Sequence, residues 1–398
     1  MQRRDFFKLS LVASSTLLTA SSTEVKTRKP IDTQEVSNVA FIEKRPLITY
    51  SDRPPLLETP RDAFTTAITP NNELFVRWHM PHIPTHIDMN TYYIHVHGEV
   101  NDRLYLRVEN LKKDFEQVEV TVVMQCGGNS RSAFVPTTSG IQWGSGAMGC
   151  SKYKGVRLKD VLQRAGLTNE SVWISLNGDD KPVMSKMPHF KRELKISEIS
   201  DDTIIAYEQN GEELPFLNGY PVRLIIPGFY ADSWVKMLSD IYVTKEYQEY
   251  FYMDHAYRVP DNVTASETPD KLAKTTKPLE LMNVKSYIGY PTSKTKLTHK
   301  SNLTIKGVAF DEGYGIKEVL ISLDKGKSWV KSSLGEELST YAFRTFSYKL
   351  KLMNRGRLTI MAKAINNKGQ EQPYAHEIAW NHGGYRYNGI DTVSIDID

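Results

Sequence analysis

The chain has 398 residues, and its 50 basic and 47 acidic residues give a formal net charge of +3. Such a balance provides no broad basic surface, so nucleic acid is not expected as a partner. With 40% hydrophobic and 24% charged residues, the composition is that of a globular protein and excludes global disorder. No apolar run reaches the roughly 18–20 residues of a membrane span. At about 150 residues per domain, the length predicts two or three domains.

Residues 1–22 have the pattern of an export signal. Arg3 and Arg4 precede an apolar stretch at residues 9–20 that is too short to span a membrane, and small residues follow it. The paired arginines resemble the twin-arginine signal of bacteria, and an ordinary secretory signal that contains two arginines is the alternative. The twin-arginine interpretation predicts a periplasmic protein that is exported folded, with a cofactor already inserted.

Residues 23–265 are expected to form a domain that mixes helices and strands. Its first part, residues 23–70, is polar and weakly patterned and is predicted to wrap a surface. There is no regular alternation of strand and helix and no GxGxxG motif, which disfavours a doubly wound nucleotide-binding fold. The expected elements are strands at residues 92–98, 118–124 and 222–226, and a helix at residues 158–165 that ends at Gly166.

Residues 266–398 are expected to form an all-β domain. A polar linker rich in Thr, Lys and Pro occupies residues 260–278. Apolar and polar residues alternate at 346–352 and 358–364, which is typical of antiparallel strands with one buried face. Residues 324–327 predict a hairpin turn. The predicted fold class is therefore α+β: a mixed domain followed by an immunoglobulin-like sandwich that lacks that fold's disulfide.

The two cysteines, Cys126 and Cys150, limit the chemistry. There is no C-x-x-C-H motif, so no c-type haem is expected on this chain, and four-cysteine metal sites are excluded. One disulfide is arithmetically possible, and a single thiolate that acts as ligand or nucleophile is the alternative. Cys126 ends an apolar strand and enters a Gly-Gly-Asn turn, so it is either a small buried hydrophobe or a functional thiol on a rigid element. Cys150 has no comparable surroundings and is expected to be structural.

Two pairs of polar residues are candidates for binding an anion. Arg77 and His79 lie on one face of a predicted strand, since side chains repeat every two residues, and they would suit an oxyanion or a phosphate. Arg223 and Lys236 flank a Pro-Gly turn and could hold one anionic ligand. For both pairs, a solvated strand face is the competing interpretation.

Eight segments in the same order together resemble the sulfite oxidase family of molybdenum enzymes, particularly its bacterial periplasmic sulfite dehydrogenases. They are FVRWH (75–79), QCGGNSR (125–131), WGSGAMG (143–149), AYEQNGEELP (206–215), NGYPVRLIIPG (218–228), WVKML (234–238), DKGKSW (324–329) and WNHGGYRYN (380–388). The last two segments resemble parts of the family's dimerisation domain. A homodimer, or a complex with a haem subunit, is therefore implied.

The resemblance also implies a molybdenum–molybdopterin cofactor, with Cys126 as the metal ligand. A soft thiolate suits such a metal centre. Arg77, His79 and Tyr257 are implied as catalytic residues, the first two also as cofactor contacts. The other implied cofactor contacts are Phe75, Asp179, Asn218, Arg223, Trp234 and Lys236.

The implied reaction is the oxidation of sulfite to sulfate. Because the chain has no haem motif, its electrons would pass to a c-type cytochrome or a haem subunit. A molybdopterin reductase acting on nitrate or a sulfoxide is the nearest alternative. A non-catalytic binding protein that has kept the fold is the alternative from another class.

Overall fold

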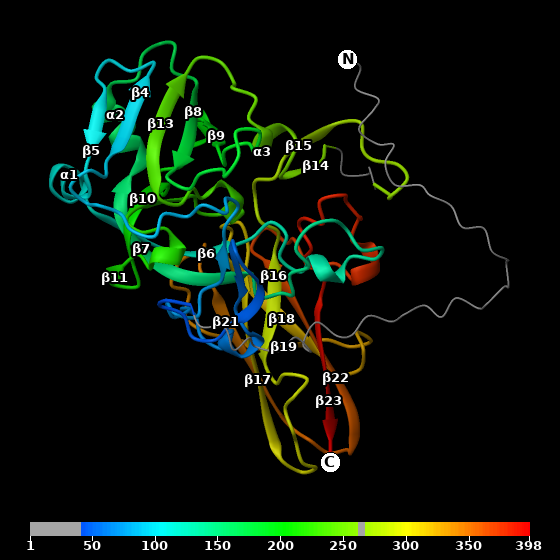
Figure 1. Ribbon diagram of the computed structural model, residues 1–398. Helices are drawn as coiled ribbons and strands as arrows, with labels where there is room; N and C mark the ends of the chain where they lie inside the picture. The colour runs from blue at the N-terminus through cyan, green and yellow to red at the C-terminus, as the bar shows by residue number, and fades with distance from the viewer. Residues whose placement is uncertain (1–40, 262–266) are drawn as a thin grey trace. The chain divides into compact units, whose positions relative to one another are not determined.

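The computed structural model describes residues 41–261 and 267–398, so the predicted export signal lies outside the described residues. Within the described ranges, no helix is long and apolar enough to cross a membrane. The described chain is mostly β with few helices (Figure 1). Its α-helices are α1 (Val108–Asp114), α2 (Leu158–Ala165) and α3 (Phe251–Asp254).

Most strands that precede residue 245 form two five-stranded sheets. The first has the order β11-β10-β7-β6, with β12 paired to β10. The second has the order β5-β4-β13-β8-β9, in which β4 and β13 run parallel (Figure 1). Their bounds are β4 (Ile94–Gly98), β5 (Leu104–Leu106), β6 (Val118–Gln125), β7 (Met148–Arg157), β8 (Trp173–Gly178), β9 (Arg192–Lys195), β10 (Ile204–Gln209), β11 (Glu212–Glu213), β12 (Arg223–Ile225) and β13 (Leu238–Thr244).

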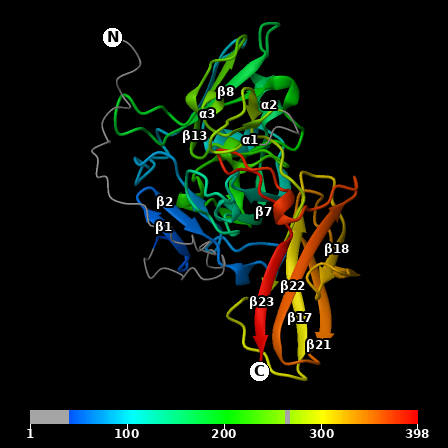
Figure 2. The ribbon, with the colours of Figure 1, turned by 90° about the vertical axis from the view of Figure 1, so that its right-hand side faces the viewer.

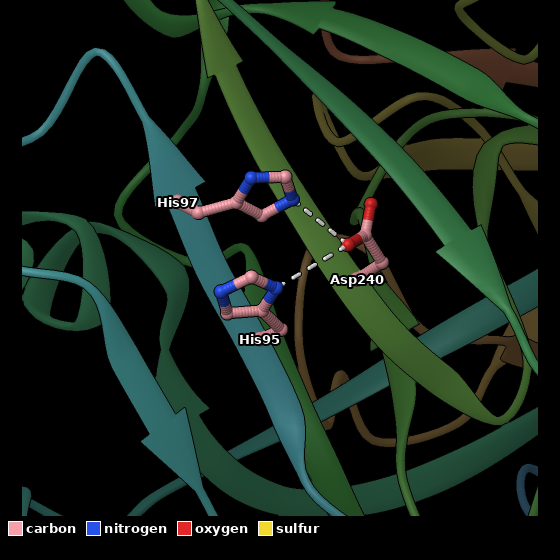
Figure 3. A group of neighbouring side chains, drawn as sticks. All are labelled: His95, His97 and Asp240. Carbon is pink, nitrogen blue, oxygen red and sulfur yellow. Dashed lines mark hydrogen bonds and ion pairs between the residues drawn. The ribbon is translucent and has the colours of Figure 1, made fainter.

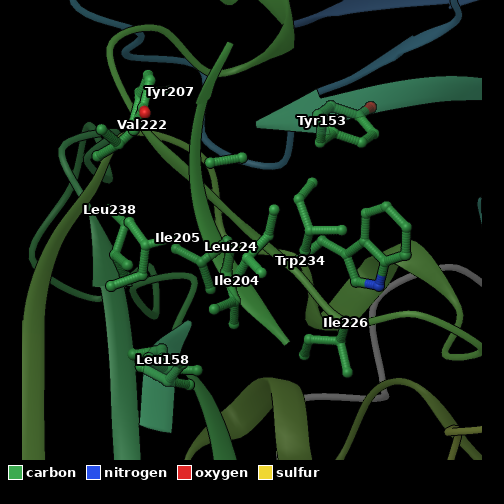
Figure 4. Close-up of a cluster of buried hydrophobic side chains, with 14 of the residues drawn as sticks. Tyr153, Leu158, Ile204, Ile205, Tyr207, Val222, Leu224, Ile226, Trp234 and Leu238 are labelled. Carbon is green, nitrogen blue, oxygen red and sulfur yellow. The ribbon is translucent and has the colours of Figure 1, made fainter. Parts of the chain in front are cut away.

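The two sheets share one hydrophobic core. Ile174 of β8 and Ile204 of β10 belong to the same cluster of buried side chains. Figure 4 shows part of it, where Leu224 lies beside Ile204 and Ile205 of β10. Burial of this apolar surface is the main force that holds the two sheets together.

The predicted helix at residues 158–165 is confirmed as α2. Leu158, Val161, Leu162 and Ala165 form its buried face. Gly166 follows with φ of 71°, a left-handed conformation that glycine adopts without steric cost, and its N–H caps the Gln163 carbonyl.

Residues 41–70 contain more regular structure than the weak sequence pattern predicts. β1 (Ile48–Asp52), β2 (Pro55–Glu58) and β3 (Val76–Arg77) form a three-stranded sheet. All of β2 is buried, including Glu58. The expected linker also contributes structure, because β15 (Thr276–Pro278) pairs with β14 (Arg258–Pro260). The β1–β3 sheet and the β14–β15 pair both join segments with little apolar alternation. Local sequence patterns therefore do not reveal these pairings.

The C-terminal part consists of two four-stranded sheets around a separate core, as Figure 2 shows for several of their strands. The alternation at residues 346–352 and 358–364 is confirmed as two antiparallel strands, and the turn at 324–327 joins a paired hairpin. The immunoglobulin-type topology stays a prediction. The strands are β16 (Lys285–Tyr290), β17 (Asn302–Phe310), β18 (Ile316–Ser322), β19 (Val330–Lys331), β20 (Ser333–Leu334), β21 (Arg344–Lys351), β22 (Gly356–Asn366) and β23 (Asp391–Ile397).

Candidate active site

Cys126 is the first residue after β6, and backbone hydrogen bonds hold it in place. Its N–H donates to the Ala147 carbonyl at 3.0 Å, and its carbonyl accepts from the Asn129 N–H at 2.9 Å. A Cβ on Gly127 would lie 2.2 Å from Leu279 Cδ2, so a larger residue there would force the buried Leu279 side chain to shift. The thiol is free and only 7% exposed. Cys126 thus directly follows a strand, as its sequence pattern predicts, and its functional role stays a prediction.

A single pocket, here called the Cys126 pocket, collects most of the residues that the sequence singled out. Cys126, Arg77 and Lys236 come from segments far apart in the chain, yet all three line it. Of the predicted site residues, those that line it are Phe75, Arg77, His79, Cys126, Asn218, Arg223, Trp234, Lys236 and Tyr257.

Asp179 is the predicted site residue that does not line the Cys126 pocket. Its N–H donates to the Met237 carbonyl at 3.1 Å, so its backbone helps to position the segment beside Lys236. The next residue, Asp180, is 6% exposed, and its carboxylate acts electrostatically on Lys236. Burial raises the pKa of Asp180 to about 6, against the influence of that lysine.

The pocket has an excess of positive charge. No carboxylate of the described residues lies within ion-pair distance of Arg77, Arg223 or Lys236. The ion pairs found in this part of the chain involve other residues. The partners of Lys236 and Arg223 are backbone carbonyls: Lys236 Nζ donates to the Arg77 carbonyl at 2.6 Å, and Arg223 Nη1 to that of Asn218 at 2.8 Å. Burial, and then Arg223, lower the pKa of Lys236 to about 7. An anionic ligand would offset the repulsion between the positive charges of Arg223 and Lys236.

Buried polar atoms beside these cations have no hydrogen-bond partner in the described part of the chain. They include Arg223 Nε and Trp234 Nε1, both donors that belong to pocket residues. An unsatisfied buried donor costs about 1–3 kcal/mol, so such atoms mark a place for a ligand. The donors suit an anion rich in oxygen, and the free thiol suits a soft metal.

His79 and Tyr257 form the second functional group of the pocket. His79 Nε2 shares a hydrogen bond with the Tyr257 hydroxyl, and Phe190 stacks on the imidazole at 3.8 Å. Burial, and then Arg77, hold the pKa of His79 well below its usual value, so the ring is neutral near pH 7. Burial also raises the pKa of Tyr257, which keeps its hydroxyl protonated. The pair is therefore neutral and can donate or accept a hydrogen bond beside the cations.

Tyr257 is held in an unusual backbone conformation by a residue of the C-terminal part. Its φ is 55°, a left-handed value that is uncommon for a bulky residue. Its N–H donates to the Tyr385 hydroxyl at 3.3 Å, and the two rings stack at 5.6 Å. Arg131, in the loop that follows Cys126 (residues 126–131, the cysteine loop), lies over the Tyr385 ring at 5.2 Å. Tyr385 thus connects the cysteine loop with Tyr257.

Sequence reasoning missed the pocket residue Asp232 and its partner. Arg192 Nη2 donates to Asp232 at 3.2 Å, and both side chains are 2% exposed. Burial raises the pKa of Asp232 to about 7, although Arg192 lowers it. Asp232 lies between the motifs at 218–228 and 234–238, whereas Arg192 lies in a charged run outside every motif. The other lining residues that were not predicted are Met124, Phe190, Leu217 and Ala231.

The cysteines do not form a disulfide. Cys150 is also free, is fully buried, and belongs to an apolar cluster. Its Sγ accepts a weak hydrogen bond from the Phe343 N–H at 3.5 Å. The structural role expected for Cys150 agrees with these surroundings.

Two family descriptions match the chain. Residues 79–252 match the oxidoreductase molybdopterin binding domain, which contains most of the Cys126 pocket. Residues 276–397 match the Mo-co oxidoreductase dimerisation domain. The matched ranges lie on either side of the predicted domain boundary near residue 265, and that boundary stays a prediction.

Individual relatives extend these matches. Mitochondrial sulfite oxidase of Mus musculus is 30% identical over 366 residues, which cover 87% of this chain and 65% of that protein. Nitrate reductase [NAD(P)H] of Hordeum vulgare is 30% identical over 318 residues, which cover 74% of this chain and 35% of that protein. The chain thus spans less than two thirds of the length of either relative.

One solved structure shares the fold over nearly the whole chain. The sulfane dehydrogenase SoxCD from Paracoccus pantotrophus superposes with a TM-score of 0.75 at 23% sequence identity. The match covers 96% of this chain and 96% of that chain. At this identity, the likeness shows a common fold.

Proposed function

The chain belongs to the sulfite oxidase family of molybdopterin oxidoreductases, and within that family we propose that it oxidises sulfite to sulfate and passes the electrons to a c-type cytochrome. The observation that carries the proposal is the Cys126 pocket. A free thiol there lies with Arg77, Arg223 and Lys236, which have no carboxylate within ion-pair distance in the described part of the chain. Such a pocket suits both an anionic cofactor and a small oxyanion substrate.

The residues present fit a molybdenum–molybdopterin group. Cys126 would supply the thiolate ligand, because it is the free cysteine that lines the pocket. Arg223 and Trp234 would direct their unsatisfied N–H donors to the anionic pterin part, with Lys236 and Asn218 beside them. When bound, this group supplies the exchange of an oxygen atom and of two electrons with the substrate.

The protein's own contribution begins with substrate binding. Arg77 would hold the sulfite dianion through charge-assisted hydrogen bonds, each worth about 1.5–3 kcal/mol. In the structure its guanidinium donates to the Trp78 carbonyl, which leaves other N–H groups for a substrate. Neutral His79 adds no charge of its own and accepts or donates a hydrogen bond at the substrate's edge.

Tyr257 would orient the substrate and control protons. Its protonated hydroxyl can donate to an oxygen of sulfite or sulfate, and His79 keeps that hydroxyl in position. Phe190 stacks on His79 and Tyr385 on Tyr257, so both rings are fixed before a substrate arrives. This preorganisation lowers the cost of reaching the reactive geometry.

The main competing function is reduction of nitrate or of a sulfoxide at the same pocket. The barley nitrate reductase resembles the chain over 74% of its length, so a shared fold does not choose between the reactions. A steady-state assay does. We expect sulfite to reduce cytochrome c in the presence of the molybdenum-loaded protein. Faster turnover of nitrate or methionine sulfoxide with reduced viologen dye would contradict the proposal.

A second measurement tests the alternative of a non-catalytic binding protein. We expect the purified protein to contain molybdenum and pterin in equal amounts, close to one of each per chain. A folded chain that is purified from its native compartment without either component would favour the binding function.

We further propose export to the periplasm by the twin-arginine route. Arg3 and Arg4 lie outside the described residues, so the proposal rests on the sequence pattern. Replacing both with lysine should leave the precursor in the cytoplasm, whereas an unchanged periplasmic yield would indicate an ordinary secretory signal. The match of residues 276–397 to a dimerisation domain supports a dimer, either of two copies or with a haem subunit.

A further inference from the structure

Two histidines and an aspartate gather on one face of the second five-stranded sheet, outside the Cys126 pocket. His95 and His97 alternate along β4, so both side chains leave the same face of the strand. The parallel neighbour β13 places Asp240 opposite His95 in the strand register. Figure 3 shows both imidazoles directed toward the Asp240 carboxylate. These three residues are called the His–Asp cluster.

The distances in the His–Asp cluster are close to those of a metal site. His97 Nε2 lies 3.0 Å from Asp240 Oδ1, and His95 Nδ1 lies 4.0 Å from the same oxygen. One ligand atom from each residue falls within 4.8 Å of the other two. In a tetrahedral zinc site with bonds of about 2.0–2.2 Å, neighbouring ligand atoms are about 3.3 Å apart. Ligand atoms that are up to 4.8 Å apart would therefore have to approach each other by up to about 1.5 Å.

The hydrogen bonding of His95 is incomplete without a ligand. Its Nε2 is buried and has no partner in the described part of the chain, and its Nδ1 is too far from Asp240 for a hydrogen bond. His97, in contrast, is already paired with Asp240. An ion between the three side chains would give Nδ1 of His95 a partner and place a positive charge beside the carboxylate, while Nε2 of His95 lies outside that coordination.

Aromatic rings pack against both imidazoles. The histidine rings stack on each other at 4.1 Å with an interplanar angle of 5°. Tyr105 stacks on the outer face of the His95 ring at 4.5 Å, and Tyr242 lies 4.8 Å from the His97 ring. An imidazole holds a metal ion near its own ring plane, so these two nearly parallel rings must tilt relative to each other when one ion binds between them. The side chains remain 25%, 27% and 31% exposed for His95, His97 and Asp240, so an ion can enter from solvent.

We propose that the His–Asp cluster binds one divalent transition-metal ion, with Zn²⁺ as the best match. His95 Nδ1, His97 Nε2 and an Asp240 oxygen would be the ligands, and water would take the remaining position. Two imidazoles and one carboxylate favour zinc over magnesium or calcium, which prefer oxygen ligands. The site is separate from the molybdenum pocket, because none of its residues lines that pocket.

Binding there would cross-link β4 and β13 at the sheet face. β13 begins at Leu238, directly after the segment that contains Lys236. A metal ion on Asp240 would therefore stiffen β13, the strand that follows this segment of the Cys126 pocket. Its expected role is structural: it stabilises the catalytic part of the protein without entering the reaction.

The test is a titration of the molybdenum-loaded full chain, free of any histidine tag, with Zn²⁺ at pH 7.5. Calorimetry should show one saturable site. His97→Gln and Asp240→Asn should each weaken binding at least 10-fold, since even residues that support a metal ligand contribute 10–100-fold. His86→Gln is the matched control, because His86 is an exposed histidine outside the cluster and should bind Zn²⁺ like the unchanged protein.

Absence of saturable binding, or equal binding by the unchanged chain and His97→Gln, would overturn the proposal. Should the cluster variants fail to fold, anomalous scattering from Zn²⁺-soaked crystals of the unchanged chain decides the question. A peak between the three side chains supports the site, and zinc found only elsewhere refutes it. Molybdenum content, measured in the same samples, shows that the catalytic pocket stayed intact.

Discussion

Cys126 and Cys150 are both free, buried thiols, and burial raises the pKa of each. Their neighbours differ. Arg77 and Arg131 act on Cys126 and partly offset the effect of burial, because positive charge favours a thiolate. Cys150 lies among apolar side chains such as Phe343, and its pKa rises to about 12. Burial alone therefore does not identify a ligand thiol; the charges around it do.

The largest effect is expected for Cys126→Ser. A hydroxyl is a poor replacement for a thiolate on a soft metal, so sulfite-dependent reduction of cytochrome c should fall below detection while the fold is kept. The measurement is turnover per folded, molybdenum-containing chain. Turnover close to that of the unchanged protein would remove Cys126 from the role of ligand.

Arg77→Gln should lower kcat/KM for sulfite by about 10–150-fold, the value of one charge-assisted hydrogen bond of about 1.5–3 kcal/mol. Most of the change should appear as a raised KM, because the charge binds the substrate. Arg164→Gln is the control, since Arg164 is exposed at the end of α2 and should leave the kinetics unchanged. A loss of less than about twofold for Arg77→Gln would place the substrate elsewhere.

Tyr257→Phe should reduce kcat by about 2–10-fold with a smaller change in KM, because it removes one neutral hydrogen bond and keeps the ring. Stopped-flow measurement of the rate of cytochrome reduction checks the expected loss in kcat. Combined with Arg77→Gln, the two losses should be non-additive, as expected for residues that share one pocket. Losses that simply add would argue against a common substrate site.

Cys150→Ser should have the smallest effect on activity, within about twofold. A hydroxyl buried among apolar groups should instead lower the free energy of unfolding by about 1–3 kcal/mol, which denaturant titration measures. If activity disappears in a Cys150→Ser protein that is still folded, the comparison between the two thiols is wrong.

The sequence predicted those features that depend on local pattern. The helix α2 and its end at Gly166 follow from helical spacing and glycine's freedom at positive φ, and the strands around Phe346 follow from alternation. Cys126 was identifiable because it enters a glycine turn directly after an apolar strand. The co-linear motifs then supplied most of the pocket.

Features that depend on long-range pairing were not predictable. Arg192 and Asp232 are 40 positions apart and meet only in the folded core. Tyr385 reaches Tyr257 across 128 positions. The His–Asp cluster likewise needs the parallel pairing of β4 with β13, which no local pattern encodes. The predicted strand at residues 92–98 contains His95 and His97, but no sequence pattern placed Asp240 beside them.

The most direct test of the central claim is X-ray absorption at the molybdenum edge for three proteins: the unchanged chain, Cys126→Ser and Cys150→Ser. If Cys126 is the protein ligand, the Cys126→Ser protein should show one sulfur neighbour fewer at molybdenum than the unchanged chain. Cys150→Ser should match the unchanged chain. An unaltered sulfur shell in Cys126→Ser, or a sulfur lost in Cys150→Ser, would contradict the assignment of the Cys126 pocket as the molybdenum site.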